Sequence, residues 1–361
     1  MNAVEGGIGG RKLTLLTKDD GYEAARVKAN TDELLETGNL FALTTTADTP
    51  GNLAVYDKVN EECVPSLIVG SGHPAWGDPR DHPWIMSSFL SYSTEANIWG
   101  KYILDTLGKG ASVAALVMNN DFGLSMRSNF ETFAKANGLS LRAEVHDPAA
   151  PNVTNELTTL ASSNADVAIL MTTSSYCTQA FTAIAQSTWK PKVKLVSQTC
   201  AGIATFFKPA GETGRDWVLA GGNKELTDKA FANDPFVQTA RATMEKAGLD
   251  PANAQHGNGW WYAWGTAEVL RNAAKLPGGL TRTNTLLAMR SLDTHHPLMY
   301  DGIKFAQNGL KDSFTAEGAQ LTRYTIEPGQ EVGAHVPFGP PIDVNATTRN
   351  CSWDGKACRE Y

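Results

Sequence analysis

Short apolar runs alternate with amphipathic, helix-like segments along most of the chain. Residues 111–118 are apolar without alternation, which is typical of a strand covered on both faces, and a helical pattern follows at 124–136. The same order recurs, with strands predicted at 12–17, 41–44, 64–69, 85–89, 141–145, 167–171, 193–197 and 217–221, and helices at 23–37, 52–62, 94–107, 152–163, 178–187, 235–247, 260–275 and 283–292. This alternation predicts an α/β fold with right-handed crossovers and mainly parallel sheets, followed beyond residue 297 by extended antiparallel strands and loops.

Polar residues stand at the carboxyl ends of several predicted strands. Asn119 and Phe122 follow the strand 111–118, and similar polar loops follow the strands that end at 69, 171 and 197. Open α/β sheets bind ligands at the carboxyl ends of their strands. These loops are therefore expected to converge on one cleft.

Composition narrows the class of partner. The 361 residues are 42% hydrophobic, which is enough to bury the cores of two lobes. With 38 acidic and 31 basic residues the net charge is −7, which disfavours nucleic acid and anionic membranes, so a small molecule or another protein is the expected partner. No apolar run is long enough to span a membrane, and the first residues lack the layout of a signal peptide.

The cysteines leave two interpretations open. None of the five stands in a Cys-x-x-Cys pair, which argues against structural zinc. Cys351 and Cys358 flank a turn-prone insert, while Cys177 and Cys200 each follow the end of a predicted strand, so either pair could form a disulfide. Two disulfides would indicate an oxidising compartment, and ordinary buried thiols are the alternative.

Five ordered motifs together resemble one family. They are Gly6-Gly7-Ile8-Gly9-Gly10-Arg11-Lys12, Thr49-Pro50-Gly51-Asn52-Leu53-Ala54-Val55, Gly70-Ser71-Gly72-His73, Asn119-Asn120-Asp121-Phe122-Gly123 and Trp189-Lys190-Pro191. The chain resembles, over about nine-tenths of its length, the type I periplasmic solute-binding proteins of branched-chain amino-acid (Leu/Ile/Val) type ABC transporters.

The resemblance implies a two-lobed binding protein that closes on its ligand by a hinge motion. Lobe 1 would comprise residues 1–91 and 223–316, and lobe 2 residues 92–222 and 317–361 with the C-terminal tail. The implied protein is a periplasmic or extracellular monomer, membrane-associated in its full-length form, that delivers a small molecule to an ABC transporter permease and needs no cofactor. Family members carry a signal peptide, a first strand and a first helix before the Gly6–Gly10 turn, so this chain is expected to start inside that helix.

The resemblance also implies the binding residues. First-lobe hydroxyls and backbone N–H groups would hold a ligand carboxylate at Thr45, Thr46, Ser71 and Gly72, although strand propensity and turn bonding also explain a threonine run. Phe122, Tyr176 and one of Trp260 and Trp261 would form apolar walls, since adjacent helical residues point to different sides. The remaining candidates are second-lobe residues at strand ends, namely Asn119, Thr173 and Gln198.

The nature of the ligand depends on Gln198. Amino-acid binders of this family tend to place an acidic residue for the ligand's ammonium group at this position. A neutral amide there predicts a ligand with a carboxylate or carbonyl, a hydrophobic or aromatic body, and no ammonium group.

Two other functions are alternatives to solute binding for an ABC transporter. A cytoplasmic ligand sensor of the same fold would regulate a partner protein, and an α/β hydrolase would use Ser71, His73 and Asp78. The sequence lacks the Gly-x-Ser-x-Gly turn of such hydrolases. A serine two residues from its base on one loop, as Ser71 is from His73, also seldom reaches triad geometry. His295-His296 lacks the spacing of a helical metal pair and indicates a solvated loop instead. The sequence therefore predicts a binding protein and not an enzyme.

Overall fold

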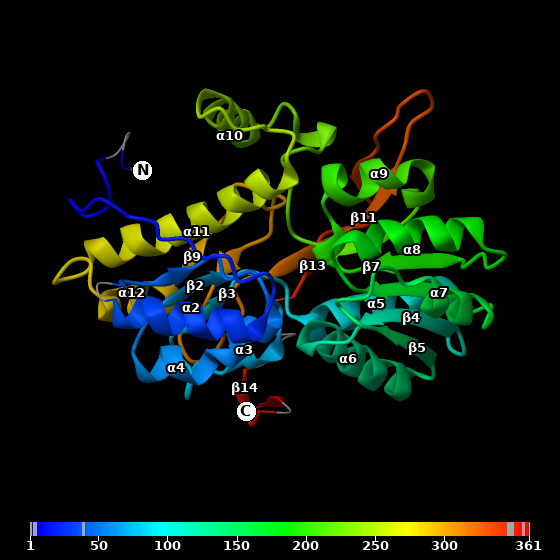
Figure 1. The fold of residues 1–361 in the computed structure, drawn as a ribbon, viewed down its shortest axis with the longest axis horizontal. Helices are drawn as coiled ribbons and strands as arrows, with labels where there is room; N and C mark the ends of the chain where they lie inside the picture. The colour runs from blue at the N-terminus through cyan, green and yellow to red at the C-terminus, as the bar shows by residue number, and fades with distance from the viewer. Residues whose placement is uncertain (1, 3–5, 38–39, 345–349, 356–357, 361) are drawn as a thin grey trace.

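The computed structural model describes residues 2, 6–37, 40–344, 350–355 and 358–360 and shows two α/β lobes side by side (Figure 1). The first lobe contains α2 (Ala24–Glu36), β1 (Leu43–Thr44), α3 (Thr49–Ala54), α4 (Tyr56–Glu61), β2 (Ser66–Val69), η1 (Pro74–Gly77) and β3 (Ile85–Ser87). The chain returns to it for α11 (Ala254–Lys275), α12 (Arg282–Arg290), β9 (Asp293–Thr294) and β10 (Phe305–Ala306). Strands β1, β2 and β3 form a parallel sheet in that order, and β9 pairs with β10.

The second lobe is built on the larger sheet. It contains α5 (Tyr92–Leu107), β4 (Ser112–Met118), α6 (Asp121–Asn137), β5 (Ser140–His146), α7 (Thr154–Ala161), β6 (Val167–Met171), α8 (Ser175–Gln186), β7 (Val193–Val196), η2 (Gln198–Cys200), η3 (Ile203–Phe207), α9 (Lys208–Ala210), η4 (Gly211–Gly214), β8 (Val218–Gly221), β11 (Gly318–Thr325), β12 (Ala334–Pro337) and β13 (Ile342–Asp343). Between β8 and α11 lie η5 (Lys229–Phe231) and α10 (Pro235–Lys246).

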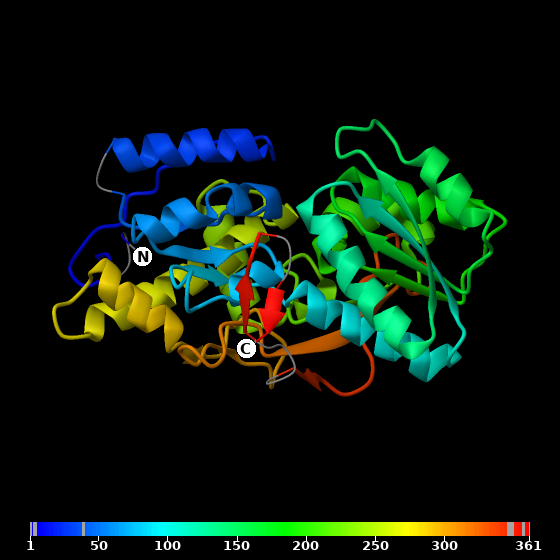
Figure 2. The ribbon, with the colours of Figure 1, turned by 90° about the horizontal axis from the view of Figure 1, so that it is seen from below.

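The strand order of this sheet is β12-β11-β8-β7-β6-β4-β5, with β13 paired to β11. Strands β4 to β8 are parallel, whereas β11 runs antiparallel to β8 and β12. Helices α5 and α6 pack together on one face, and α7 and α8 cover the other (Figure 2). The predicted α/β class with mainly parallel sheets and helices on both faces is confirmed.

Strand β4 is the element that the apolar pattern predicted most directly. It lies between β5 and β6, and residues 113–118 are all buried, as expected for a strand covered on both faces. The loop after it is shorter than the sequence suggested. Asn120 caps α6 by accepting a hydrogen bond from Gly123 N, so Phe122 belongs to the first helical turn.

The prediction of a strand at 12–17 is wrong. Ile8 and Arg11 form an isolated bridge across the Gly9-Gly10 turn, but the following residues form no strand. Leu15 and Leu16 are 74% and 63% exposed. An apolar alternation forms a strand only where a neighbouring strand supplies backbone partners, and within the described part of the chain none lies beside this segment.

The C-terminal residues return to the first lobe. Strand β14 (Cys351–Trp353), which pairs with β15 (Cys358–Glu360), packs against η1, and the ring of Trp353 lies 4.8 Å from that of His73. The sequence placed 317–361 with the second lobe, so the position of β14 differs from that expectation. The remaining lobe boundaries stay a prediction.

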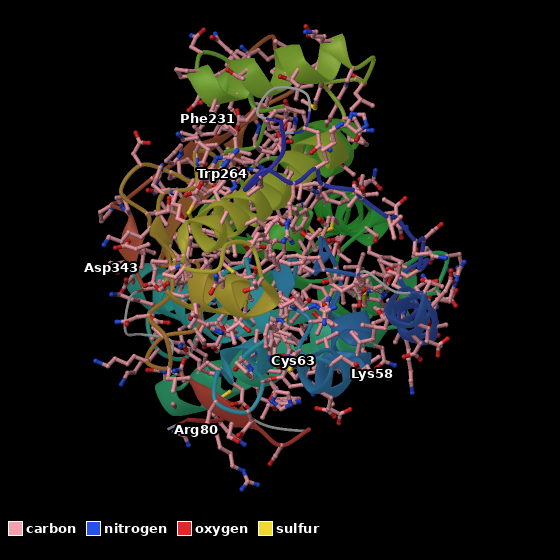
Figure 3. All side chains as sticks on the ribbon, turned by 90° about the vertical axis from the view of Figure 1, so that its left-hand side faces the viewer. Lys58, Cys63, Arg80, Phe231, Trp264 and Asp343 are labelled. Carbon is pink, nitrogen blue, oxygen red and sulfur yellow. A yellow bond between two sulfur atoms is a disulfide. The ribbon has the colours of Figure 1, made fainter. Side chains whose placement is uncertain are left out.

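The described cysteines fall into three groups. Cys177 and Cys200 form the predicted disulfide. Cys351 is also disulfide-bonded, while the side chain of Cys358, its predicted partner, lies outside the described part of the structure. Cys63 is an exposed free thiol near Lys58 of α4 (Figure 3).

Loss of the Cys177–Cys200 disulfide is expected to lower the free energy of unfolding by about 3 kcal/mol. The bond closes a loop across a sequence separation of 23, so cutting it increases the freedom of the unfolded chain. Urea unfolding of the Cys177→Ala/Cys200→Ala variant measures the loss, with Cys63→Ser as the control that should change stability by less than about 0.5 kcal/mol. Equal stability of the double variant and the parent would contradict the expectation.

Candidate functional site

A cavity of about 720 Å³ lies between the two lobes. Loops at the carboxyl ends of β2, β4, β6 and β7 contribute to its walls, as the sequence predicted, together with α11 and the crossover after β8. The lining residues discussed below are Asp48, Trp261, Tyr262 and Tyr300 from the first lobe, Tyr92, Phe122, Thr173, Gln198 and His335 from the second lobe, and Glu225 from the crossover after β8.

The first-lobe wall is polar at its base. Asp48 caps α3, and its carboxylate accepts a hydrogen bond from Gly51 N. Burial raises the pKa of Asp48 to about 6. Tyr262 approaches the loop after β2 closely because residue 70 is a glycine, where a Cβ atom would lie 2.3 Å from the tyrosine hydroxyl oxygen.

Trp261 is one of the lining residues whose hydrogen bonding is incomplete. Its ring stacks on His296 with a centroid distance of 4.0 Å, and its indole Nε1–H is buried without a partner among the described residues. His296 Nδ1 accepts from Leu298 N, so Nε2–H donates to the Trp261 carbonyl at 3.1 Å. His296 is also fully buried. The prediction that His295 and His296 lie in a solvated loop is therefore wrong for His296. Buried donors nearly always have acceptors, so Trp261 leaves one unsatisfied N–H in the wall of the cavity.

The second-lobe wall combines one aromatic ring with the start of a helix. Phe122 meets Tyr92, the first residue of α5, edge-on, with ring centroids 5.4 Å apart. Thr173 donates to Thr199 O at 3.4 Å, which joins the loops after β6 and β7. Ser174, at the N-terminus of α8, has a φ of 60° and makes no side-chain capping bond.

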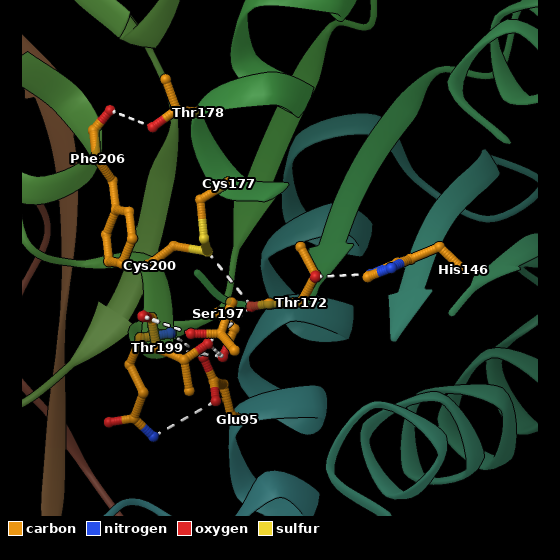
Figure 4. The surroundings of a disulfide bond; sticks show 11 residues. Glu95, His146, Thr172, Cys177, Thr178, Ser197, Thr199, Cys200 and Phe206 are labelled. Carbon is orange, nitrogen blue, oxygen red and sulfur yellow. Dashed lines mark hydrogen bonds between the residues drawn. A yellow bond between two sulfur atoms is a disulfide. The ribbon is translucent and has the colours of Figure 1, made fainter. Parts of the chain in front are cut away.

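Gln198 is held by the buried carboxyl group of Glu95, a side chain that Figure 4 labels in the surroundings of the disulfide. The backbone N–H of Gln198 lies 3.0 Å from Glu95 Oε1, and its side-chain Nε2 donates to Leu90 O at 3.3 Å and to Glu95 Oε2 at 3.4 Å. Reversing the amide would place its oxygen against the Leu90 carbonyl oxygen, so Leu90 fixes the orientation. Gln198 consequently offers the cavity an acceptor oxygen, whereas a ligand carboxylate needs a donor.

Glu95 itself is fully buried in α5. Burial raises the pKa of Glu95 to about 8, and the two hydrogen bonds from Gln198 offset only part of that effect. The carboxyl group that positions Gln198 is therefore mainly protonated at neutral pH.

Four predicted binding residues line the cavity and six do not. Those that line it are Phe122, Thr173, Gln198 and Trp261, and those outside it are Thr45, Thr46, Ser71, Gly72, Asn119 and Tyr176. Which of them bind ligand stays a prediction. As expected for adjacent helical residues, Trp261 lines the cavity, while Trp260 packs edge-on against Phe236, 5.8 Å away.

The six outlying residues have other contacts or positions. Ser71 is fully buried and accepts a hydrogen bond from Trp76 Nε1 at 3.0 Å, and a Cβ on Gly72 would lie 2.2 Å from Leu90 O. Tyr176 turns its hydroxyl away to donate to Pro148 O at 2.7 Å and Ala150 O at 2.6 Å. Thr45 and Asn119 are exposed outside the cavity, and Thr46 keeps a buried hydroxyl without a described partner.

The lining residues that the sequence does not predict include Asp48, Tyr92, Glu225, Tyr300 and His335. Asp48 carried a usable signal, since it precedes Thr49-Pro50, a pattern typical of a capped helix start. Glu225 and His335 carried none, because a loop residue after β8 and a histidine in the C-terminal region meet only through the tertiary fold.

The family of the chain follows from its sequence profile. Residues 1–322 match the model of the periplasmic binding protein family. The chain belongs to this family. Its members are extracytoplasmic solute-binding proteins, so the chain is a binding protein and not an enzyme. None of the helices described is long and apolar enough to cross a membrane.

Solved structures share the fold at low sequence identity. A branched-chain amino acid ABC transporter protein from Thermus thermophilus with bound valine has a TM-score of 0.80 at 18% identity, over 94% of this chain and 88% of its own. A fatty acid ABC transporter substrate-binding protein from Thermomonospora curvata has a TM-score of 0.76 at 17% identity, over 94% of this chain and 85% of its own. A leucine-binding protein from Thermotoga maritima has a TM-score of 0.72 at 15% identity, over 95% of this chain and 91% of its own. Curated protein sequences yield no significant match.

Proposed function

We propose that this periplasmic binding protein is the solute-binding component of an ABC importer and holds a small ligand between its lobes. The observation that carries the proposal is the buried, unpartnered indole N–H of Trp261 in a cavity walled by both lobes. Hinge closure would bring Phe122 and Gln198 against a ligand bound to the first lobe. The closed form would then dock on the ABC transporter permease as a monomer, with a signal peptide and membrane association in the full-length protein.

The proposed ligand carries a carboxylate or carbonyl on a hydrophobic or aromatic body. The Trp261 donor suits such an acceptor, and the rings of Phe122, Tyr92 and Tyr262 suit the apolar body. The Thermus protein was solved with valine, and the Thermomonospora protein belongs to a fatty acid transporter. Valine and fatty acids both combine a carboxylate with an apolar body.

A thermal-shift screen of amino acids and of aliphatic and aromatic carboxylates tests the function. Binding to the folded protein raises the melting temperature, by an amount that grows with the logarithm of the ligand concentration above Kd, so at least one of these compounds is expected to stabilise the chain. Absence of any stabilisation across the screen would count against the proposal.

Trp261→Phe is expected to weaken binding of the best compound about tenfold. The substitution removes the indole donor but keeps an aromatic ring on His296, so folding should persist. Isothermal titration calorimetry measures the change, and Trp260→Phe is the matched control because Trp260 lies outside the cavity. Equal affinities of Trp261→Phe and the parent would remove Trp261 from the binding site.

A further inference from the structure

Glu225, Tyr300 and His335 form one corner of the cavity, which we call the acceptor corner. Asp228 lies behind it, 1% exposed, and accepts hydrogen bonds from His335 N at 3.0 Å and Ala230 N at 2.8 Å. The backbone holds Glu225 and Tyr300 near Asp228, since Asp228 N donates to Glu225 O at 3.0 Å and Tyr300 N donates to Gly222 O, three residues before Glu225, at 2.8 Å. Burial raises the pKa of both Glu225 and Tyr300, and the negative charge of Asp228 adds to both shifts. The corner therefore has a buried anion at its back.

His335 contributes a lone pair. The side chain is 5% exposed, and its Nε2 lies 2.7 Å from Ala201 O, so Nε2 carries the proton and donates. Burial lowers the pKa of His335 and keeps the ring neutral. Its Nδ1 is then an acceptor, and it has no partner among the described residues.

Glu225 contributes a carboxyl group that forms no salt bridge within the described part of the chain. Thr227 donates its hydroxyl to Glu225 Oε2 at 2.5 Å. The neighbouring Lys224 is engaged elsewhere, with its ammonium 3.0 Å from Asp234 Oδ2 and 3.5 Å from Asp301 Oδ1. Arg241 of α10 also lies near enough to lower the pKa of Glu225, but its guanidinium donates to Leu226 O.

We propose that the acceptor corner binds a protonated amine or guanidinium group of the ligand. A cationic nitrogen would give Glu225 its counter-ion and give His335 Nδ1 a donor, and the ring of Tyr300 would add a cation–π surface. This inference rests on the proposed function, since it concerns the same cavity. It differs from the expectation, based on Gln198, that the ligand has no ammonium group.

Matched pairs of compounds test the inference by isothermal titration calorimetry at pH 8. The pairs are lysine and norleucine, arginine and citrulline, and 5-aminopentanoate and pentanoate, which differ mainly in the distal cation. Burial raises the pKa of Glu225 to about 7, so at pH 8 most of it is ionised. In at least one pair the basic member is expected to bind about tenfold or more tightly than its neutral partner.

Glu225→Gln keeps an acceptor for Thr227 and removes the charge, so it should abolish the preference for the basic member of each pair. Glu212→Gln, at an exposed ion pair with Arg215, is the control and should retain the preference. The comparison within each pair uses the parent protein alone and stands even if Glu225→Gln folds poorly. Binding of neutral compounds without a basic preference would overturn the inference and leave the proposed function intact, whereas no binding by any compound would overturn both.

Discussion

Replacing Arg290 by alanine is expected to lower the free energy of unfolding by about 4 kcal/mol. Arg290 ends α12 and is 7% exposed. Its guanidinium donates to Pro83 O at 2.8 and 3.0 Å, to Ile85 O at 2.7 Å and to Gln307 Oε1 at 3.2 Å. These bonds join α12 to the β3 segment and to the chain after β10, and alanine would leave the buried acceptors without donors.

Urea unfolding of Arg290→Ala measures this loss, and Arg215→Ala is the matched control. Arg215 pairs with Glu212 on the surface at 2.8 Å, where an ion pair contributes less than about 1 kcal/mol. Arg290→Lys should fall between the parent and Arg290→Ala, because an ammonium group cannot reach all of the acceptors at once. A loss below about 1 kcal/mol in Arg290→Ala would show that water replaces the guanidinium at these carbonyls.

The free energy of unfolding of the parent minus that of the Glu95→Gln variant is expected to fall by about 4 kcal/mol between pH 4.5 and pH 8. Burial raises the pKa of Glu95 from 4.5 to about 8, so the folded state holds a proton that the unfolded state has released. That contribution to stability is complete below pH 4.5, declines as the pH rises, and is lost above pH 8. The variant lacks this titration, so the difference between the two proteins isolates it.

Chemical unfolding of both proteins at pH 5, 6, 7, 8 and 9 provides the measurement. Other raised carboxyl groups, such as Asp48 and Glu225, affect both proteins alike and cancel in the difference. A difference independent of pH would mean that Glu95 is ionised in the folded state and has a cation or water beside it.

The fold was largely predictable from the sequence where a strand is buried on both faces. Strands β4 and β6 appear in the sequence as apolar runs, β7 as an apolar run interrupted by Lys194, and the predicted bounds agree with the observed ones to within one residue. The segment 12–17 failed because alternation records only the side chains, whereas a strand also needs a backbone partner. Helix α6 starts at Asp121, three residues before the predicted start at residue 124, because Asn120 caps the helix and is not part of a longer loop.

The candidate site was predictable only in part. Phe122, Thr173 and Gln198 line the cavity because parallel topology brings strand ends to one edge. Ser71 lies outside the cavity lining, and its hydroxyl bonds to Trp76 and Thr49, a competition among neighbours that no sequence motif records. His335 enters the cavity wall on the antiparallel strand β12, and its position depends on the whole second-lobe sheet.

The Cys177–Cys200 disulfide joins the first turn of α8 to the loop after β7, and both segments wall the cavity. The two loops are thereby ordered during folding, so a ligand has less conformational entropy to remove when it binds. The reduced protein would meet that entropic cost again on each binding event. The redox state of the surrounding compartment therefore acts on ligand affinity as well as on the fold.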